Sequence, residues 1–439
     1  MNLDMTKGSP AKLMLRFALP MLVGNIFQQF YNIADTLIVG RFVGRDALAA
    51  VGSAFAIMVL VNSLLIGFSM GAATLFSQQF GAGDYKRLKT TISLSGCFIM
   101  AVTVVLAAAA FLLTDQIILL YRMPPETIGY ARDYLLCIFA GLPFVSMYNL
   151  SANLLRSMGD SRSPLYFLII SCVVNIVLDL IFVLPLGMGV FGAALATLIA
   201  QCISAILCLV HTFGKIRFLN FTGADFRYDA KLFRLVIRFS LLTGIQQSVM
   251  NFGIVLVQGL VNTFGAALMA AFAAGVKIDA FAYLPVQDFG NAFSTFAAQN
   301  TGAGEKQRVR QGFRSALLIS AAFSIAITVL VFIFARSLIG IFIDRADVEV
   351  ISIGAAYLRM EGLFYILIGF LFLLYGLYRG IGRAGISVIL TVLSLGSRVL
   401  IAYTCAPVFG YTAIFWAIPL GWLLADLVGF GIWFMQKKE

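Results

Sequence analysis

The chain has 439 residues, of which 61% are hydrophobic and only 12% are charged, and its net charge at pH 7 is +11. Ordinary soluble domains carry about 25% charged residues, so this composition excludes a soluble globular protein. The positive charge does not indicate nucleic-acid binding, because the basic residues cluster in alternate loops between apolar segments, as the positive-inside rule requires of a membrane protein.

Apolar segments long enough to cross a bilayer, which takes about 20 residues, recur along the whole chain. They predict an all-α polytopic membrane protein with twelve transmembrane helices. The expected spans are 16–39, 47–75, 90–113, 128–153, 164–184, 192–213, 239–261, 268–296, 315–334, 351–377, 386–405 and 412–434. Most of the 31 lysines and arginines then fall on the same side as the N-terminus, which predicts that both termini are cytoplasmic.

The first span is unusually polar. Four of its side chains recur at helical spacing and form one stripe, namely Asn25, Gln28, Asn32 and Asp35. Tyr31 shares that side of the helix, and Pro20 interrupts the apolar part before it. A carboxylate at membrane depth costs at least about 2.5–3.5 kcal/mol, so Asp35 should face a water-filled path or a partner and not lipid.

A second carboxylate, Asp179, lies deep in the fifth span, one helical turn after Asn175. The fourth span adds Asn149 and the sixth adds Thr197. Two buried carboxylates with amides and a hydroxyl can hold a proton or, with both ionised, a cation such as Na+. The alternative interpretation is that the two acids only hydrogen-bond neighbouring helices.

The second half of the chain repeats landmarks of the first half in the same order. The segment 78–84 is answered by 299–305 after 221 residues, Arg16-Phe17 by Arg238-Phe239 after 222, and the segment 156–159 by 379–382 after 223. Six spans per repeat put both halves into the membrane in the same direction. The repeat therefore predicts two six-helix lobes, 1–214 and 238–439, related by a pseudo-two-fold axis along the membrane normal and joined by a cytoplasmic linker, 215–237.

The second half has diverged in chemistry, because Val257 and Ala402 stand where the first half has Asp35 and Asp179. Its candidates for lining a cavity are Gln246, Asn251, Lys277, Asp279, Glu361 and Arg398. We expect Lys277 and Asp279 to pair with each other or with another helix. Glu361 is expected either to line the cavity or to pair with a neighbouring helix.

The chain offers no convincing enzyme site. The segment 67–71 has the Gly-x-Ser-x-Gly spacing of a hydrolase nucleophile elbow, but it lies inside a span with no strand before it. The single histidine, His211, supplies neither a triad nor a metal cluster. We therefore expect a protein that is not an enzyme and that uses no cofactor beyond a coupling ion.

These landmarks resemble the multidrug and toxic compound extrusion (MATE) transporters, in particular their DinF-like branch. The resemblance rests on the doubled twelve-span layout, on Gln-x-x-Gly-Ala-Gly after spans two and eight, on Leu-Arg-Ser-Met-Gly-Asp after span four, and on the first-span pattern from Pro20 to Gly40. It implies that Asn175 and Asp179 form a cation-site pair, that Asn149 and Thr197 support it, and that Pro20 bends the first helix.

The resulting hypothesis is an antiporter of the cell membrane that exchanges H+ or Na+ for amphipathic, often cationic compounds by alternating access. The coupling ion would bind at Asp35 and Asp179, supported by Tyr31, Asn149, Asn175 and Thr197. We expect a monomer surrounded by membrane lipid. The alternative function is a flippase for a lipid-linked saccharide or peptidoglycan precursor, but its pyrophosphate would require several cations, and only Lys277, Arg359 and Arg398 are available.

Overall fold

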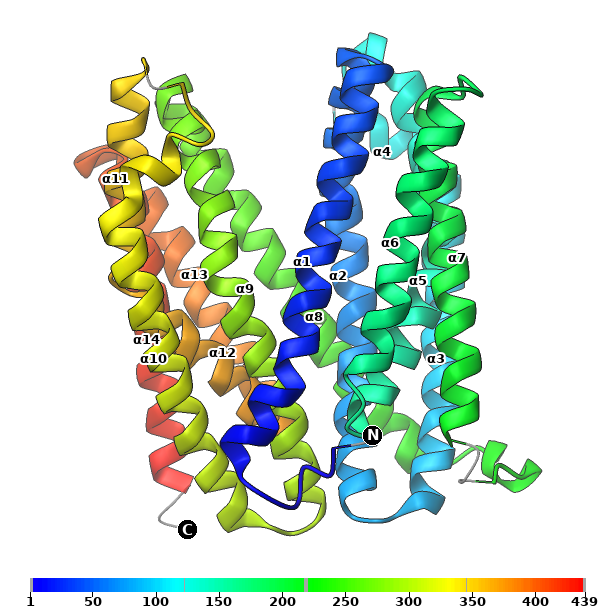
Figure 1. Cartoon of the computed structure of the whole chain (residues 1–439). Coiled ribbons are helices and arrows are strands. Elements are labelled where there is room, and N and C mark those ends of the chain that lie inside the picture. The colour runs from blue at the N-terminus through cyan, green and yellow to red at the C-terminus, as the bar shows by residue number, and fades with distance from the viewer. Residues whose placement is uncertain (1–2, 122, 217–219, 345, 437–439) are drawn as a thin grey trace. The chain divides into compact units, whose positions relative to one another are not determined.

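The computed structural model describes residues 3–121, 123–216, 220–344 and 346–436, and all regular structure in them is helical (Figure 1). The all-α prediction is confirmed. The long helices are α1 (Pro10–Phe42), α2 (Arg45–Gly81), α3 (Tyr85–Leu112), α5 (Pro125–Ser157), α6 (Arg162–Val183), α7 (Gly189–Lys215), α8 (Ala230–Val261), α9 (Ala266–Gly302), α10 (Lys306–Ile339), α13 (Ala384–Phe409) and α14 (Thr412–Gln436). Shorter elements are α4 (Thr114–Leu120), α11 (Val348–Gly362), α12 (Tyr365–Gly380), η2 (Gly223–Phe226) and η3 (Asn262–Phe264).

The helices account for the twelve predicted spans. Ten of the described helices are long and apolar enough to cross a membrane, and the pair α11 and α12 makes an eleventh. The twelfth is α1, which at 33 residues is long enough to span but carries the polar stripe that lowers its hydropathy. The span that the sequence marks as functionally unusual is thus the one without a continuous apolar stretch as hydrophobic as those of the other spans.

The tenth span is broken where the sequence predicts one continuous helix. The axes of α11 and α12 differ by 52° across a short break at residues 363–364. The break frees the Gly362 carbonyl, and Thr328 of α10 donates a hydrogen bond to it over 2.6 Å. Irregular backbone at membrane depth is tolerated where protein satisfies it in this way. The buried side chain of Glu361 lies directly beside the break.

The chain divides into two compact units. Unit 1 comprises Met1–Asp4 and Leu19–Gly244, and unit 2 comprises Met5–Ala18 and Ile245–Glu439. The divisions therefore fall inside α1 and α8, whereas the sequence predicts lobes 1–214 and 238–439 with a linker between them. Helix α8 begins at Ala230, so the end of the predicted linker is helical, and residues 217–219 of that linker lie outside the described residues.

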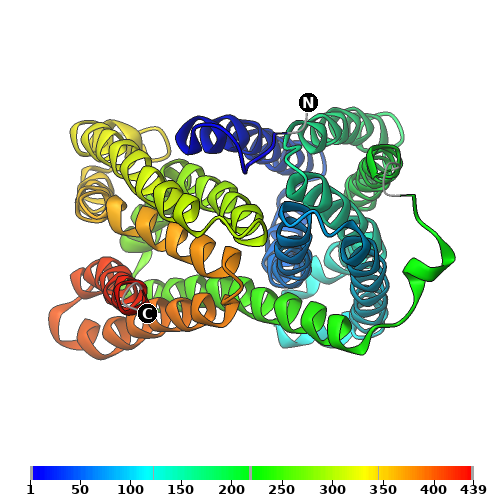
Figure 2. The same ribbon diagram turned by 90° about the horizontal axis from the view of Figure 1, so that it is seen from below.

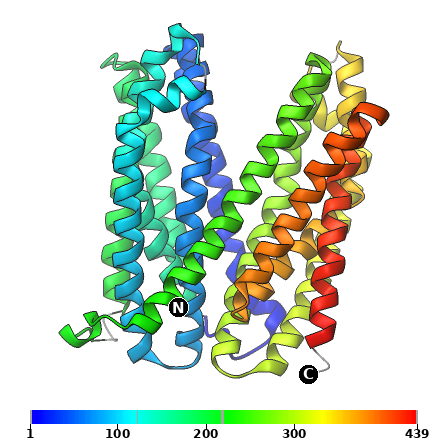
Figure 3. The same cartoon turned by 180° about the vertical axis from the view of Figure 1, so that it is seen from behind.

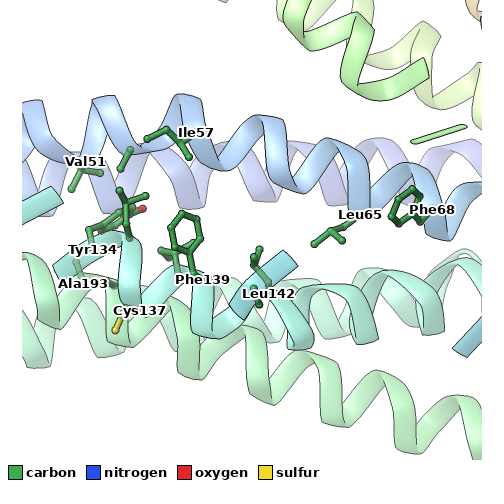
Figure 4. Packing of buried hydrophobic residues seen from close by; sticks show 14 of the residues in the cluster. Val51, Ile57, Leu65, Phe68, Tyr134, Cys137, Phe139, Leu142 and Ala193 are labelled. Atoms are coloured by element: carbon green, nitrogen blue, oxygen red, sulfur yellow. The ribbon is translucent and has the colours of Figure 1, made fainter. Parts of the chain in front are cut away.

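The core of unit 1 lies between α2 and α5. Figure 4 shows Val51 and Ile57 of α2 facing Tyr134 and Phe139 of α5, and all four belong to one buried apolar cluster. Helix α5 also packs against α3 and α7, and α6 packs against α7. Helix α5 is therefore the central element of this unit.

The helices of unit 2 have the same neighbours as their counterparts in unit 1. Helix α12 packs against α9, α10, α13 and α14, α11 packs against α9 and α10, and α13 lies along α14 (Figures 2 and 3). The turns repeat as well. Gly83 and Gly304 end α2 and α9 with φ of +69° and +77°, a conformation that favours glycine. The repeat seen in the sequence is thus a repeat in packing and in turn geometry.

Candidate functional site

Unit 1 buries the two carboxylates that the sequence marks. Asp35 of α1 is 7% exposed and Asp179 of α6 is completely buried, and Asp35 lies within electrostatic range of Asp179. Each has one oxygen, Oδ1, that is buried without a hydrogen-bond partner among the described residues. A buried carboxylate without a partner is costly, so this arrangement calls for a bound proton or cation.

A chain of polar groups leads to Asp179. Tyr31 Oη and Thr197 Oγ1 are 3.3 Å apart, and Asn175 also lies beside Thr197. Oriented so that both of its amide atoms find partners, Asn175 donates from Nδ2 to Asp179 Oδ2 over 3.1 Å and accepts from Thr197 Oγ1 and the Thr197 backbone N–H over 3.2 Å. Three helices, α1, α6 and α7, thus contribute to one connected group of oxygen and nitrogen atoms.

Helical spacing explains why these side chains meet. Tyr31 precedes Asp35 by four residues in α1, and Asn175 precedes Asp179 by four in α6. Residues four apart lie on the same face of a helix, so each helix presents a polar pair on one side. Tyr31, Asp35, Asn175, Asp179 and Thr197 are therefore brought together in the structure.

Two other predicted residues stand apart from this group. Asn149 donates from Nδ2 to the Val145 carbonyl of its own helix over 2.9 Å. Pro20 lies inside α1, where the helix continues although proline has no N–H to donate to the preceding turn. It directly follows Leu19, where α1 passes into unit 1.

Sequence reasoning does not identify Tyr134, which the structure buries near the carboxylates. This α5 tyrosine is 4% exposed and lies within electrostatic range of Asp35, Tyr31 and Asp179. A single aromatic residue in an apolar span ordinarily indicates packing, so no pattern could have selected it. Asn149 is 15 residues further along the same helix, about 22 Å at 1.5 Å per residue, and its amide is hydrogen-bonded within α5.

Unit 2 contains a second buried acidic pair. Asp279 of α9 and Glu361 of α11 are each 5% exposed, and their carboxyl groups lie within hydrogen-bonding reach of one another. Tyr365 donates to Asp279 Oδ1, and Tyr357 lies within hydrogen-bonding reach of both acids. Two adjacent carboxyl groups can form a hydrogen bond only if one of them carries a proton.

Arg398 of α13 belongs to this second cluster, because Glu361 and Asp279 lie within its electrostatic range. Lys277 does not. Lys277 is exposed, and its ammonium lies 5.6 Å from the centre of the Phe342 ring. Lys277 and Asp279 therefore do not pair with each other. Lys277 and Asp279 are two residues apart, which puts them on different faces of α9.

Among the described residues, the amides of α8 take no part in the hydrogen bonds of this cluster. Asn251 donates to the Gln247 carbonyl of its own helix over 3.1 Å, and Gln246 is 2% exposed. Of the six second-half candidates, the structure therefore groups Asp279, Glu361 and Arg398.

A long all-helical chain with ionisable clusters at membrane depth is typical of multi-span membrane transporters. The MatE family model matches residues 20–181 and 240–404, one match in each repeat. The chain therefore belongs to the MATE family of transporters, and it is a multi-span membrane protein and not an enzyme.

Similar proteins cover nearly the whole chain. "Probable multidrug resistance protein YpnP" of Bacillus subtilis is 29% identical over 98% of this chain and 93% of its own length. "Probable multidrug resistance protein YoeA" of the same organism is 30% identical over 78% of this chain and 75% of its own length. The fold is that of the crystal structure described as MATE in the bent conformation, with a TM-score of 0.92 at 24% identity over 98% of this chain and 96% of that one.

Proposed function

We propose that the chain is a cation-coupled antiporter that exports amphipathic, often cationic compounds by alternating access. The observation that carries the proposal is the buried pair Asp35 and Asp179, each with an oxygen free to bind an ion. The names of the similar Bacillus proteins, which describe multidrug resistance, support drugs or toxic metabolites as the exported compounds. They do not favour a flippase.

The coupling ion is H+ or Na+. Na+ suits the site because hard oxygen ligands are present, namely the carboxylates of Asp35 and Asp179, the Thr197 hydroxyl and the Asn175 amide oxygen. H+ suits it because either carboxylate accepts a proton. Ion binding offsets the cost of burying two like charges. The hydrogen bond between the Tyr31 and Thr197 hydroxyls joins Tyr31 to the same group of polar atoms.

Coupling requires that the ion prefer one state of the transporter, because an ion with equal affinity for both states shifts nothing. Asp35 is in α1, the helix that contains Pro20 and that belongs partly to each unit. We propose that ion binding favours a bent α1, in which Pro20 already removes one backbone hydrogen bond. Bending moves Asp35 relative to Asp179 and thereby gives the two states different ion affinities.

We also propose a location in the cell membrane with both termini in the cytoplasm, because most lysines and arginines fall on that side. A single chain contains the whole group of Tyr31, Asp35, Asn175, Asp179 and Thr197, which supports a functional monomer. The acidic pair Asp279 and Glu361 and the nearby Arg398 are proposed to lie on the substrate path through unit 2.

The test is efflux of ethidium from proteoliposomes under separately imposed H+ and Na+ gradients. It compares the wild type with Asp35→Asn and Asp179→Asn. The matched control is Asp115→Asn, because Asp115 is 62% exposed in a surface ion pair with Arg132. We expect gradient-driven efflux to fall at least tenfold in both buried variants, to survive in the control, and to respond to only one of the two gradients.

Efflux that survives both buried substitutions would refute the coupling site. Absence of dye movement under either gradient in the wild type would refute drug antiport and turn attention to lipid-linked cargo.

A further inference from the structure

Arg398 of α13 occupies the position in the second repeat that Asn175 of α6 occupies in the first. The two are 223 residues apart, as are Gly159 and Gly382, which precede these helices with φ of +86° and +85°. The two family matches also end 223 residues apart, at 181 and 404. In unit 1 this position holds an amide that donates to a carboxylate, whereas in unit 2 it holds a permanent positive charge.

The packing of α13 against α14 restricts the position of the Arg398 side chain. A Cβ on Gly421 of α14 would stand 2.3 Å from the Ser394 carbonyl oxygen and 3.4 Å from Arg398 Cβ, so α13 and α14 approach each other closely beside Arg398. The guanidinium lies 5.9 Å from the centre of the Trp422 ring on α14. Arg398 is therefore held between helices and is not a freely moving surface side chain.

Carboxyl and phenol groups from several helices surround the guanidinium. Those within its electrostatic range are Asp279 of α9, Glu361 and Tyr357 of α11, and Tyr375 of α12. Arg398 Nε is buried without a hydrogen-bond partner among the described residues, and so are Asp279 Oδ2 and Glu361 Oε2. The charge thus acts on these groups without a direct ion pair among the described residues.

The charges of this cluster balance. Asp279 and Glu361 lie within hydrogen-bonding reach, and with one proton shared between them the pair carries one negative charge. Arg398 supplies one positive charge. A third carboxyl in this unit, Asp426 of α14, is within electrostatic range of Tyr375, and both of its oxygens are buried without partners in the described part of the chain. The cost of an unpaired buried charge favours its uncharged form.

The acidic pair of unit 1 has no such compensation. Within the described residues, neither Asp35 nor Asp179 has a lysine or arginine among the groups that act on it electrostatically. An ion must therefore come from solution. In unit 2 the side chain of Arg398 already provides the charge that such an ion would bring.

We propose that Arg398 is a tethered counter-ion that replaces the exchangeable cation in the second repeat. It is a positioning residue that restricts ion coupling to the site in unit 1, and its removal uncovers a second cation site at Asp279 and Glu361. The proposal rests on the proposed coupling site at Asp35 and Asp179. It also predicts that the wild type binds one coupling ion per protein.

The experiment counts ions bound by the purified full-length protein in detergent. One arm measures binding of radioactive sodium, and the other measures protons released in weakly buffered solution when ethidium is added. The variants are Arg398→Asn, which restores the residue type of unit 1, and Arg398→Lys, which keeps the charge. Arg359→Asn is the matched control, because Arg359 also lies on an aromatic ring in unit 2, 5.5 Å from the centre of Phe332, but it is only partly buried and donates to the Phe332 carbonyl.

In the arm in which the wild type binds an ion, we expect Arg398→Asn to double the number of ions bound per protein. Arg398→Lys and Arg359→Asn should leave that number unchanged. Asp35→Asn should abolish binding in the wild-type background, and the double variant with Arg398→Asn should regain one ion. Gel filtration and the thermal midpoint verify that each variant is folded.

Different outcomes separate the two proposals. An unchanged ion count in folded Arg398→Asn, with binding still lost in Asp35→Asn, overturns the tethered counter-ion and leaves the coupling site standing. Ion binding that survives Asp35→Asn in the wild-type background overturns the coupling site instead. If Arg398→Asn does not fold, the wild-type count decides, because two ions per protein would refute the proposal and one would support it.

Discussion

The contact between α2 and α8 in unit 1 offers a sharp test of the structure, because it depends on glycine. A Cβ placed on Gly71 would stand 2.3 Å from the Phe239 carbonyl oxygen, 2.6 Å from the Phe239 carbonyl carbon and 2.7 Å from Ser240 Cα. All three are backbone atoms and cannot rotate away. On the preceding turn, a Cβ on Gly67 would stand 2.5 Å from Gly244 Cα. The Gly67–Gly71 spacing that resembles a nucleophile elbow in the sequence therefore serves close helix packing.

The cost of Gly71→Ala follows from these distances. Non-bonded carbon atoms pack at about 3.5–4.0 Å, so the helices must separate by roughly 1 Å to admit the methyl group. Overpacking of this kind costs about 1–3 kcal/mol. Separation also breaks the 3.1 Å hydrogen bond from Ser240 Oγ to the Phe68 carbonyl, which contributes about 0.5–1.5 kcal/mol. Alanine recovers up to about 1 kcal/mol of helix propensity, so the net loss of stability should be roughly 1–3 kcal/mol.

The assay is equilibrium unfolding of the purified protein in mixed detergent micelles. Gly96→Ala in α3 is the matched control, because a Cβ there would meet no heavy atom within 4 Å. We expect the control to be neutral or slightly stabilised and Gly71→Ala to unfold at lower denaturant. Equal stability of the two variants would refute the described contact between α2 and α8.

Three further predictions concern single side chains. Thr197→Val removes a hydroxyl that takes part in two hydrogen bonds, each contributing about 0.5–1.5 kcal/mol, so ion-driven efflux should fall roughly 5- to 100-fold. Efflux should recover in Thr197→Ser. Unchanged efflux in the valine variant would contradict a role of this hydroxyl in the coupling site. Tyr365→Phe leaves Asp279 Oδ1 without its donor and should lower stability by about 1–3 kcal/mol in the same unfolding assay, whereas a neutral effect would argue against that bond. The hydrogen bond from Lys89 and those from the backbone N–H and hydroxyl of residue 222 lower the pKa of Asp225 to about 2. Asp225 therefore stabilises linker docking above its unfolded pKa of about 3.9 and loses this effect as pH falls towards 2. Asp225→Asn should speed tryptic cleavage of the linker at neutral pH, and an unchanged rate would show that the linker is held by other contacts.

The spans were predictable because each depends on a local property of the chain. A bilayer demands about 20 apolar residues, and a helix satisfies its backbone without any partner, so hydropathy alone locates such segments. Hydropathy did not predict the break in the tenth span after Gly362. There the Thr328 hydroxyl of another helix donates a hydrogen bond to the Gly362 carbonyl. No hydropathy pattern records a hydrogen bond supplied by a residue 34 positions away.

The candidate site was only partly predictable. Asp35 and Asp179 are recognisable because charged residues are rare at membrane depth, and their helical neighbours Tyr31 and Asn175 follow from four-residue spacing. The sequence could not show whether Asn149 joins the site. Spacing within one helix does not determine which part of that helix faces another helix.

The sequence by itself determined the helical class, the spans, the internal repeat and the carboxylates of unit 1. These features depend on hydropathy, on helical periodicity and on similarity at a constant offset, all of which are properties of the linear chain. Only the tertiary structure decided that Tyr134 lies beside Asp35, that Lys277 faces away from Asp279, and that Arg398 lies beside Glu361. Those outcomes depend on how helices rotate and pack against one another, and that is determined by contacts between residues distant in the sequence.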